Sequence, residues 1–310
     1  MSPRVRLGTA LAVVAALGVA GCAADRGIGR PPRAPQMVAP NDAIPADLDI
    51  VIRVDLARVR AGLGPEAVRA LRKNAALENA AEPTDAWVSD AIERADTALL
   101  ALRPEFGSEG PDNVLVLNGN FEGLWPLTGA PEGWQTPLDL GGNVRRFDRK
   151  RLGVRSSPAR FYAFGKEQLV ILSAAEIDSV ELVLEQGRPP NTLKPKASGL
   201  LSFQARLRDA RRLLGRRFPI LGRLLGDAVS AAGTVDIGAD TLVTDLGLEL
   251  LDPGQASAAA TVLDELAKSL AGVEGRIGLV ARNAKVEAAG RFVAVRVSLD
   301  RASLAGLWPH

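Results

Sequence analysis

The chain contains a single cysteine, Cys22, among its 310 residues, and this limits how it can hold itself together. One thiol cannot form a disulfide within the chain, so burial of apolar side chains has to stabilise the fold. The one histidine is His310. Because zinc sites draw mainly on cysteine and histidine, we expect no metal site and no cofactor.

The residues before Cys22 follow the pattern of an export signal. Arg4 and Arg6 precede an uncharged stretch, Leu7 to Ala20, that is rich in alanine, valine and leucine. The stretch is shorter than the about 20 residues that a helix needs to cross a bilayer core. Basic residues, an apolar run and small residues in this order predict a secretory signal. A plain signal peptide with an incidental cysteine, or an uncleaved anchor, are the alternatives.

The residues Val19-Ala20-Gly21-Cys22 resemble the lipobox of bacterial lipoproteins. The resemblance implies that 1–21 are a signal peptide that is removed, and that Cys22 carries diacylglycerol and an acyl chain such as palmitate. Several acyl chains together give stable membrane anchoring. Residue 23 is alanine, not the aspartate that often retains lipoproteins at the inner membrane. We therefore expect a lipid-anchored protein of the outer membrane that faces the periplasm.

Proline content suggests where the folded parts begin and end. We predict a flexible tether over 22–45 and a linker over 188–199, since both stretches are rich in proline. The linker would separate a first module, 46–187, from a second module, 200–310. Loss of the signal's two arginines lowers the formal net charge from +2 to 0, so the basic balance does not indicate a nucleic-acid partner.

Alternating hydrophobicity predicts antiparallel sheets covered by helices. Residues 242–250 alternate leucine with polar or small residues, as a half-buried strand does. Asp252 and Pro253 then favour a helix start, and 276–299 alternates again, with Gly290 at a turn. In the first half, Ser173 and Glu176 fit a capping box. We expect an α+β fold: two similar modules of antiparallel sheet with helices packed on one face.

Two pairs of segments suggest that the modules are related by duplication. Residues 49–64 and 200–215 both read as a strand that continues into a helix, and 94–102 resembles 238–246. The order of these segments, with the closing strand and helix at 293–307, is similar to that of uncharacterised proteobacterial envelope lipoproteins. That group has no known function, so the resemblance implies no catalytic residues.

No motif for catalysis is present. The sequence has no GxSxG nucleophile motif and no glycine-rich phosphate loop. A glycosidase needs two carboxylates across a cleft. Four neighbouring carboxylates could supply such a pair: Asp236, Asp240, Asp245 and Glu249. Because two of them alternate with leucines, they are better explained as the exposed face of a sheet. We predict that the protein is not an enzyme.

Two basic clusters, 145–160 and 206–223, stand out in a mature chain of zero net charge. A basic amphipathic helix can lie on an anionic surface, and lipopolysaccharide phosphates or peptidoglycan carboxylates are the available anions. An ordinary solvated surface, with arginine stems covering apolar side chains, is the simpler explanation and the one that we favour for both clusters. The candidate anion-binding residues are Arg145, Arg146, Arg149, Arg211, Arg212, Arg216 and Arg217.

Trp134 lies in a proline- and glycine-rich stretch and is the candidate for a partly exposed ring that stacks on a ligand. Taken together, these features favour a membrane-anchored binding or scaffold module without enzymatic activity, whose protein partner the sequence does not identify. A chaperone or assembly factor for outer-membrane components, or a hydrolase with an unrecognised carboxylate site, are the alternatives.

Overall fold

The computed structural model describes residues 39–64, 86–103, 112–124, 127, 133–151, 158–207, 226–238 and 240–300. The chain divides between Lys194 and Pro195 into two compact units, each with its own series of antiparallel strands. This division falls inside the predicted linker, 188–199.

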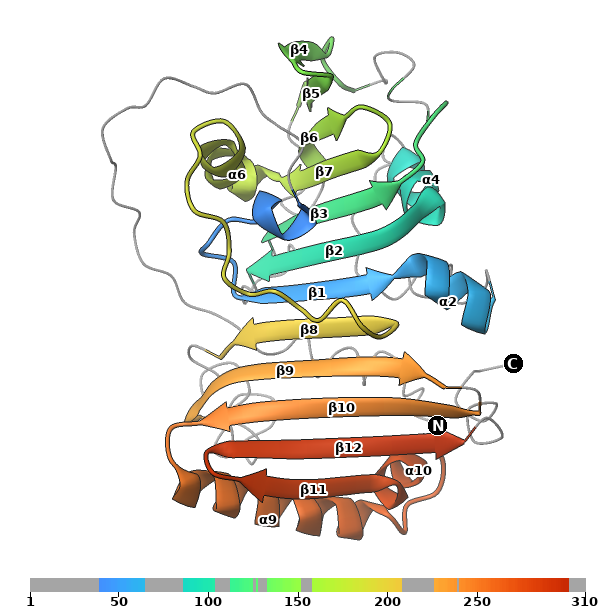
Figure 1. Ribbon diagram of the computed structural model, residues 1–310, viewed down its shortest axis with the longest axis vertical. Coiled ribbons are helices and arrows are strands. Elements are labelled where there is room, and N and C mark those ends of the chain that lie inside the picture. The colour runs from blue at the N-terminus through green and yellow to red at the C-terminus, as the bar shows by residue number, and fades with distance from the viewer. Residues whose placement is uncertain are drawn as a thin grey trace. The chain divides into compact units, whose positions relative to one another are not determined.

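The first unit contains a sheet whose strands lie in the order β1-β2-β3-β7-β6-β5-β4, each antiparallel to its neighbour (Figure 1). Its described elements are η1 (Pro40–Ala43), β1 (Ile50–Asp55), α2 (Leu56–Leu63), α4 (Ala86–Arg94), β2 (Ala95–Arg103), β3 (Asp112–Gly119), β4 (Leu138–Gly141), β5 (Val144–Asp148), β6 (Pro158–Phe164), β7 (Gln168–Ser173), η3 (Ala174–Glu176) and α6 (Ile177–Leu184).

The second unit contains a sheet in the order β11-β12-β10-β9-β8, again antiparallel throughout. Its described elements are β8 (Leu201–Arg206), β9 (Ala228–Ile237), β10 (Thr241–Leu250), α9 (Pro253–Leu270), α10 (Arg276–Arg282), β11 (Ala284–Ala289) and β12 (Phe292–Asp300).

The two units share one strand topology, which confirms the predicted α+β fold of two similar modules. In each unit three successive strands pair in order, and the last strand of the unit then pairs with the third: β1-β2-β3-β7-β6 matches β8-β9-β10-β12-β11. The similarity of 49–64 and 200–215 falls on the equivalent strands β1 and β8. The other predicted match does not hold, because 94–102 belongs to a second strand and 238–246 leads into a third.

Helices cover both faces of the first sheet, a refinement of the expected single face. Phe161 and Tyr162 are neighbours on β6, so their side chains point to opposite faces. The Phe161 ring packs on Trp87 of α4 at 4.6 Å between centroids, while the Tyr162 hydroxyl donates a hydrogen bond to Glu185 beside α6. All six residues of β7 are buried, as expected of a strand covered on both faces.

The first unit begins earlier and ends later than predicted. Ala43 and Ile44, assigned to the tether, are fully buried. Asn191, assigned to the linker, is 1% exposed, and its side-chain amide donates to the carbonyl oxygens of Pro45 and Leu48 at 2.8 and 2.7 Å. The amide thus satisfies two buried acceptors, and the tether ends before the η1 turn.

Of the two helix starts predicted from capping residues, one cap is confirmed and the other is wrong. Asp252 accepts a hydrogen bond from the Gln255 amide at 2.9 Å, which confirms the predicted start of α9. The capping box is wrong: the Ser173 hydroxyl accepts from the distant Asn113 amide at 3.1 Å, and Ser179 donates to the Glu176 carboxylate at 2.6 Å.

The predicted strand at the start of 276–299 is also wrong, because Arg276–Arg282 form the helix α10. Gly278 explains why a helix fits here. A Cβ at this position would lie 1.7 Å from the Val273 carbonyl oxygen, so only glycine lets α10 approach the turn after α9 this closely. Gly290 does form the predicted turn, with φ of 58°.

We predict that Phe161→Ala lowers the free energy of unfolding by about 3–5 kcal/mol, because a fully buried ring leaves a cavity. Phe292→Ala is the control, since that ring is 51% exposed, and its cost should stay below about 1 kcal/mol. Urea denaturation of both variants measures the difference; equal costs would contradict the described core.

Candidate functional site

The described residues of the predicted basic cluster 145–160 lie on β5, on β6 and directly after β5, and strand alternation divides the arginines of β5 between two faces. Arg146 is paired with Tyr162 in the β5–β6 register, and Arg145 with Ala163. Since paired residues share a face and neighbours do not, Arg146 lies on the face covered by α6. Arg145 lies on the other face, with its guanidinium carbon 5.7 Å from the centre of the Phe147 ring.

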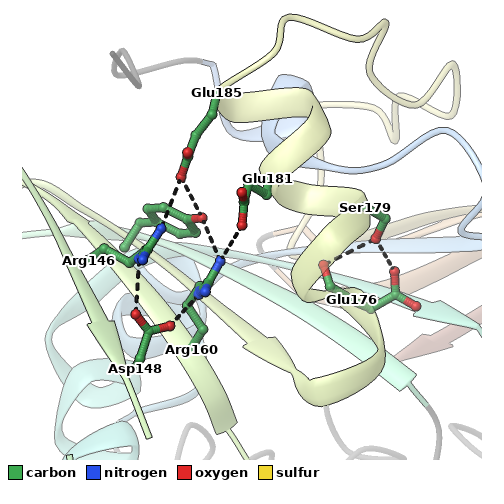
Figure 2. A network of polar contacts seen from close by, with 8 residues as sticks. Arg146, Asp148, Arg160, Glu176, Ser179, Glu181 and Glu185 are labelled. Carbon is green, nitrogen blue, oxygen red and sulfur yellow. Dashed lines mark hydrogen bonds and ion pairs between the residues drawn. The ribbon is translucent and has the colours of Figure 1, made fainter. Parts of the chain in front are cut away.

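Arg146 and Arg160 are held by carboxylates of the protein itself (Figure 2). Arg146 Nε donates to Asp148 at 3.0 Å, and Arg160 Nε donates to the other oxygen of the same carboxylate. Arg160 also donates to Glu181 of α6 at 2.7 Å. One carboxylate of β5 therefore bridges two arginines, and one of these reaches the helix.

Glu185 and Tyr162 complete this network. The Tyr162 hydroxyl donates to Glu185 at 3.1 Å, and a nitrogen of Arg146 lies 3.8 Å from the same carboxylate. Burial raises the pKa of the Tyr162 phenol above its usual value, against the lowering effect of Arg160. The phenol is therefore a neutral donor at physiological pH, and the network fastens α6 to the sheet.

Arg149 is also committed to internal contacts. Its side chain is largely buried, at 7% residue exposure, and it donates to the carbonyl oxygen of Pro158 at 2.9 Å. The guanidinium carbon lies 5.7 Å from the centre of the Trp134 ring. Within the described residues, Arg146 and Arg149 thus serve the fold rather than present a free cationic surface.

The expectation that Trp134 is partly exposed is wrong. Trp134 has no exposed surface, and its ring meets Trp87 and Phe161 edge-on at 6.0 and 5.0 Å between centroids. The backbone explains this, because the Gln135 amide donates to the Asp148 carbonyl oxygen at 2.8 Å and fixes the segment beside β5. The indole nitrogens of Trp87 and Trp134 are buried without an acceptor among the described residues.

An open concavity of about 500 Å³ lies where the β4–β5 and β6–β7 turns meet the segment after β3. Arg145 is the arginine of the predicted cluster that lines it. The residues that line the concavity are Glu122, Leu127, Gly142, Asn143, Arg145, Phe164, Gly165, Lys166 and Glu167. The turns bring these residues together, and the sequence indicated only Arg145, because Glu122, Leu127 and the residues 164–167 are distant from it along the chain.

Tight turns fix the shape of this concavity. Gly142, Asn143 and Gly165 all have positive φ, at 60°, 66° and 57°, and the Gly165 amide donates to the Asn143 carbonyl oxygen at 2.8 Å. A Cβ at Gly165 would lie 2.7 Å from the Asn143 side-chain nitrogen. The two turns are therefore in contact, and glycine is required where they meet.

The charges around the concavity are of both signs. Lys166 is paired with Glu122 at 2.9 Å, and both side chains are more than half exposed. Among the described residues, the Arg145 side chain donates one hydrogen bond, to the Leu127 carbonyl oxygen at 3.0 Å. Since a guanidinium carries five N–H donors, Arg145 retains donors for an anionic group.

A second polar site surrounds Glu176 at the start of α6. Its side chain is 1% exposed and lies 3.3 Å from Arg103, which also binds Asp47. Burial raises the pKa of the Glu176 carboxyl, and the hydrogen bond from Ser179 and the charge of Arg103 offset only part of that effect. This carboxyl was not singled out in the sequence, which gives no signal of its burial.

The remaining predicted residues are accounted for as follows. Cys22, Arg211, Arg212, Arg216 and Arg217 lie outside the described residues. Asp245 is paired with Arg296 at 3.6 Å and Glu249 with Arg291 at 2.7 Å, so both carboxylates face cations on the second sheet.

The described residues contain no group of three or more histidine, cysteine, aspartate or glutamate side chains placed to hold a metal ion. They also contain no helix that is long and apolar enough to cross a membrane.

No family model and no curated protein matches this chain, but its fold is similar to solved structures of TP0453. Crystal form III matches with a TM-score of 0.52 and 11% identity, over 87% of this chain and 98% of that chain. Form IV gives 0.51 and form I gives 0.50, each at 10% identity and over 96% of that chain. At such low identity, the likeness shows the shared fold alone.

We predict that Arg160→Met lowers the free energy of unfolding by about 2–3 kcal/mol, because it removes the cation that binds both Asp148 and Glu181 and leaves Asp148 with Arg146 alone. Arg296→Met is the matched control: its side chain is 61% exposed, so the cost should be below about 1 kcal/mol. Urea denaturation of both variants tests this, and a loss for Arg160→Met no larger than the control's would contradict the clamp.

A pH titration tests the raised pKa of Glu176. An unfolded glutamate loses its proton near pH 4.3, and a buried one with a raised pKa keeps its proton to a higher pH. The folded state then holds more protons, and stability falls as pH rises through the folded pKa. We therefore expect the free energy of unfolding of Glu176→Gln, relative to the parent protein, to rise between about pH 4 and pH 7. A constant difference across that range would contradict the raised pKa.

Proposed function

We propose that this protein is a non-enzymatic lipoprotein of the cell envelope, whose folded units bind anionic groups of envelope polymers. Acyl chains on Cys22 would anchor it, and the tether before η1 would let the units reach their ligand. The export pattern before Cys22 supports the anchoring part of the proposal, and several acyl chains would give stable attachment.

The position of Arg145 is the observation that carries the binding part. Of the three predicted arginines within the described residues, Arg146 and Arg149 are used in internal contacts. Arg145 lines an open concavity of about 500 Å³ and makes one side-chain hydrogen bond to the part of the chain that the structure describes. The remaining N–H donors, with the nearby Lys166 ammonium, suit an oxyanion.

Phosphate and carboxylate are the two oxyanions that envelope polymers present. Lipopolysaccharide carries phosphates, and peptidoglycan carries carboxylates. Arg145 would bind either group through parallel N–H donors. The second predicted cluster, which includes Arg211, Arg212, Arg216 and Arg217, would add attraction to an anionic surface at about 1 kcal/mol per arginine. The outer membrane, facing the periplasm, is the location that fits this proposal.

Sedimentation with purified lipopolysaccharide or peptidoglycan tests the binding proposal. We predict that Arg145→Gln and the quadruple change of Arg211, Arg212, Arg216 and Arg217 to Gln each weaken binding by about fivefold or more at low salt. Lys194→Gln is the control, because it removes one charge from an exposed ion pair away from the concavity. Raising the salt concentration should reduce binding of the parent protein as well.

Two outcomes would reject this part of the proposal. One is a parent protein that does not sediment with either polymer. The other is binding that all three variants retain equally. Loss of binding to lipopolysaccharide alone, or to peptidoglycan alone, would identify which oxyanion is recognised.

A further inference from the structure

The strand β11 forms one end of the second unit's sheet, so one of its edges has no neighbouring strand among the described residues (Figure 1). On its other edge it is paired along its length with β12, from Ala284 opposite Val297 to Ala289 opposite Phe292. Lys285, Glu287, Ala288 and Ala289 are exposed. An edge of this kind presents backbone N–H and C=O groups that can pair with another strand.

Two opposite charges on this strand have no partner. Lys285 and Glu287 are two residues apart and therefore on the same face of the sheet. Neither makes a hydrogen bond or ion pair within the described part of the chain. Lys285 is instead opposite Arg296, a like charge, and Arg296 is already paired with Asp245 at 3.6 Å. An acidic group on the open side of β11 would relieve this arrangement.

Exposed apolar side chains lie on the two helices that precede β11. On α9, Val262 and Leu266 are each 37% exposed. On α10, Ile277 and Val280 are 50% and 40% exposed. Both helices lie beside β11, because α9 runs along this strand and α10 leads into it (Figure 1). A partner strand with its own helices would cover apolar surface as well as backbone groups.

We propose that β11 pairs antiparallel with β11 of a second copy of this chain, with Val286 at the two-fold axis. This register places Lys285 opposite Glu287 of the second copy, and Glu287 opposite Lys285 of the second copy. Each charge thereby gains one partner of opposite sign, so that two ion pairs form across the interface, at the spacing at which cross-strand pairs interact.

Neighbouring registers do not achieve this. Centring the pair on Lys285 places like charges opposite each other, and centring it on Glu287 does the same. Moving one strand by one residue along the other places Lys285 opposite Ala288 and Val286 opposite Glu287. The charge pattern of β11 is therefore self-complementary in one register, which favours a second copy over an unrelated peptide strand.

Crosslinking through a new cysteine tests this register in the full chain, in membranes of cells that produce it. Val286→Cys brings two thiols together at the axis, and a short bismaleimide should trap a dimer. Ala232→Cys, on the interior strand β9, should give no dimer. The parent chain measures any contribution from Cys22.

Charge reversal provides the decisive comparison. In the Val286→Cys background, Glu287→Lys or Lys285→Glu should each reduce the dimer yield by about tenfold, because like charges then face each other twice. The double swap, Lys285→Glu with Glu287→Lys, restores opposite charges and should restore the dimer. If Val286→Cys does not fold, the dimer fraction of the same charge variants without the new cysteine can be measured by analytical sedimentation in detergent.

A monomeric parent chain, or a double swap as impaired as the single changes, would overturn the proposal. Recovery in the double swap would establish the register, since a general effect of charge on solubility would not be reversed by exchanging the two residues.

Discussion

Burial on both faces of β6 is the constraint on which the first unit depends. With a single cysteine, the chain has no internal disulfide to support it. Phe161 joins the rings of Trp87, Trp134 and Phe147 on one face, and Tyr162 lies in the apolar core under α6 on the other. One strand thus connects two cores. Loss of either core would expose the face of the sheet that this core covers.

This arrangement also determines what the arginines can do. Strand alternation sends Arg146 and Arg160 toward α6, where Asp148, Glu181 and Glu185 bind them. It sends Arg145 the other way, to the rim of the concavity formed by the two turns. A dense basic cluster in the sequence therefore separates, in the fold, into arginines that fasten a helix and one, Arg145, that lies at the rim of the concavity with N–H donors unused among the described residues.

Patterns that depend on local chemistry could be predicted from the sequence, and features that depend on distant partners could not. The alternation over 242–250 and the Asp252 cap gave β10 and the start of α9 correctly. Trp134 was misjudged because its proline- and glycine-rich neighbours suggest a surface loop, while a backbone hydrogen bond to β5 buries it. α10 was missed because seven residues are too few to show helical periodicity, and the close approach at Gly278 cannot be read from the chain.

The division of the arginines can be measured directly by following the Nε–H resonances of Arg145, Arg146 and Arg160 by NMR while inorganic phosphate is added. The account predicts a saturable shift of the Arg145 resonance, with those of Arg146 and Arg160 unchanged because their carboxylate partners hold them. A shift of Arg146 or Arg160 in place of Arg145, or no shift of any of the three, would contradict it.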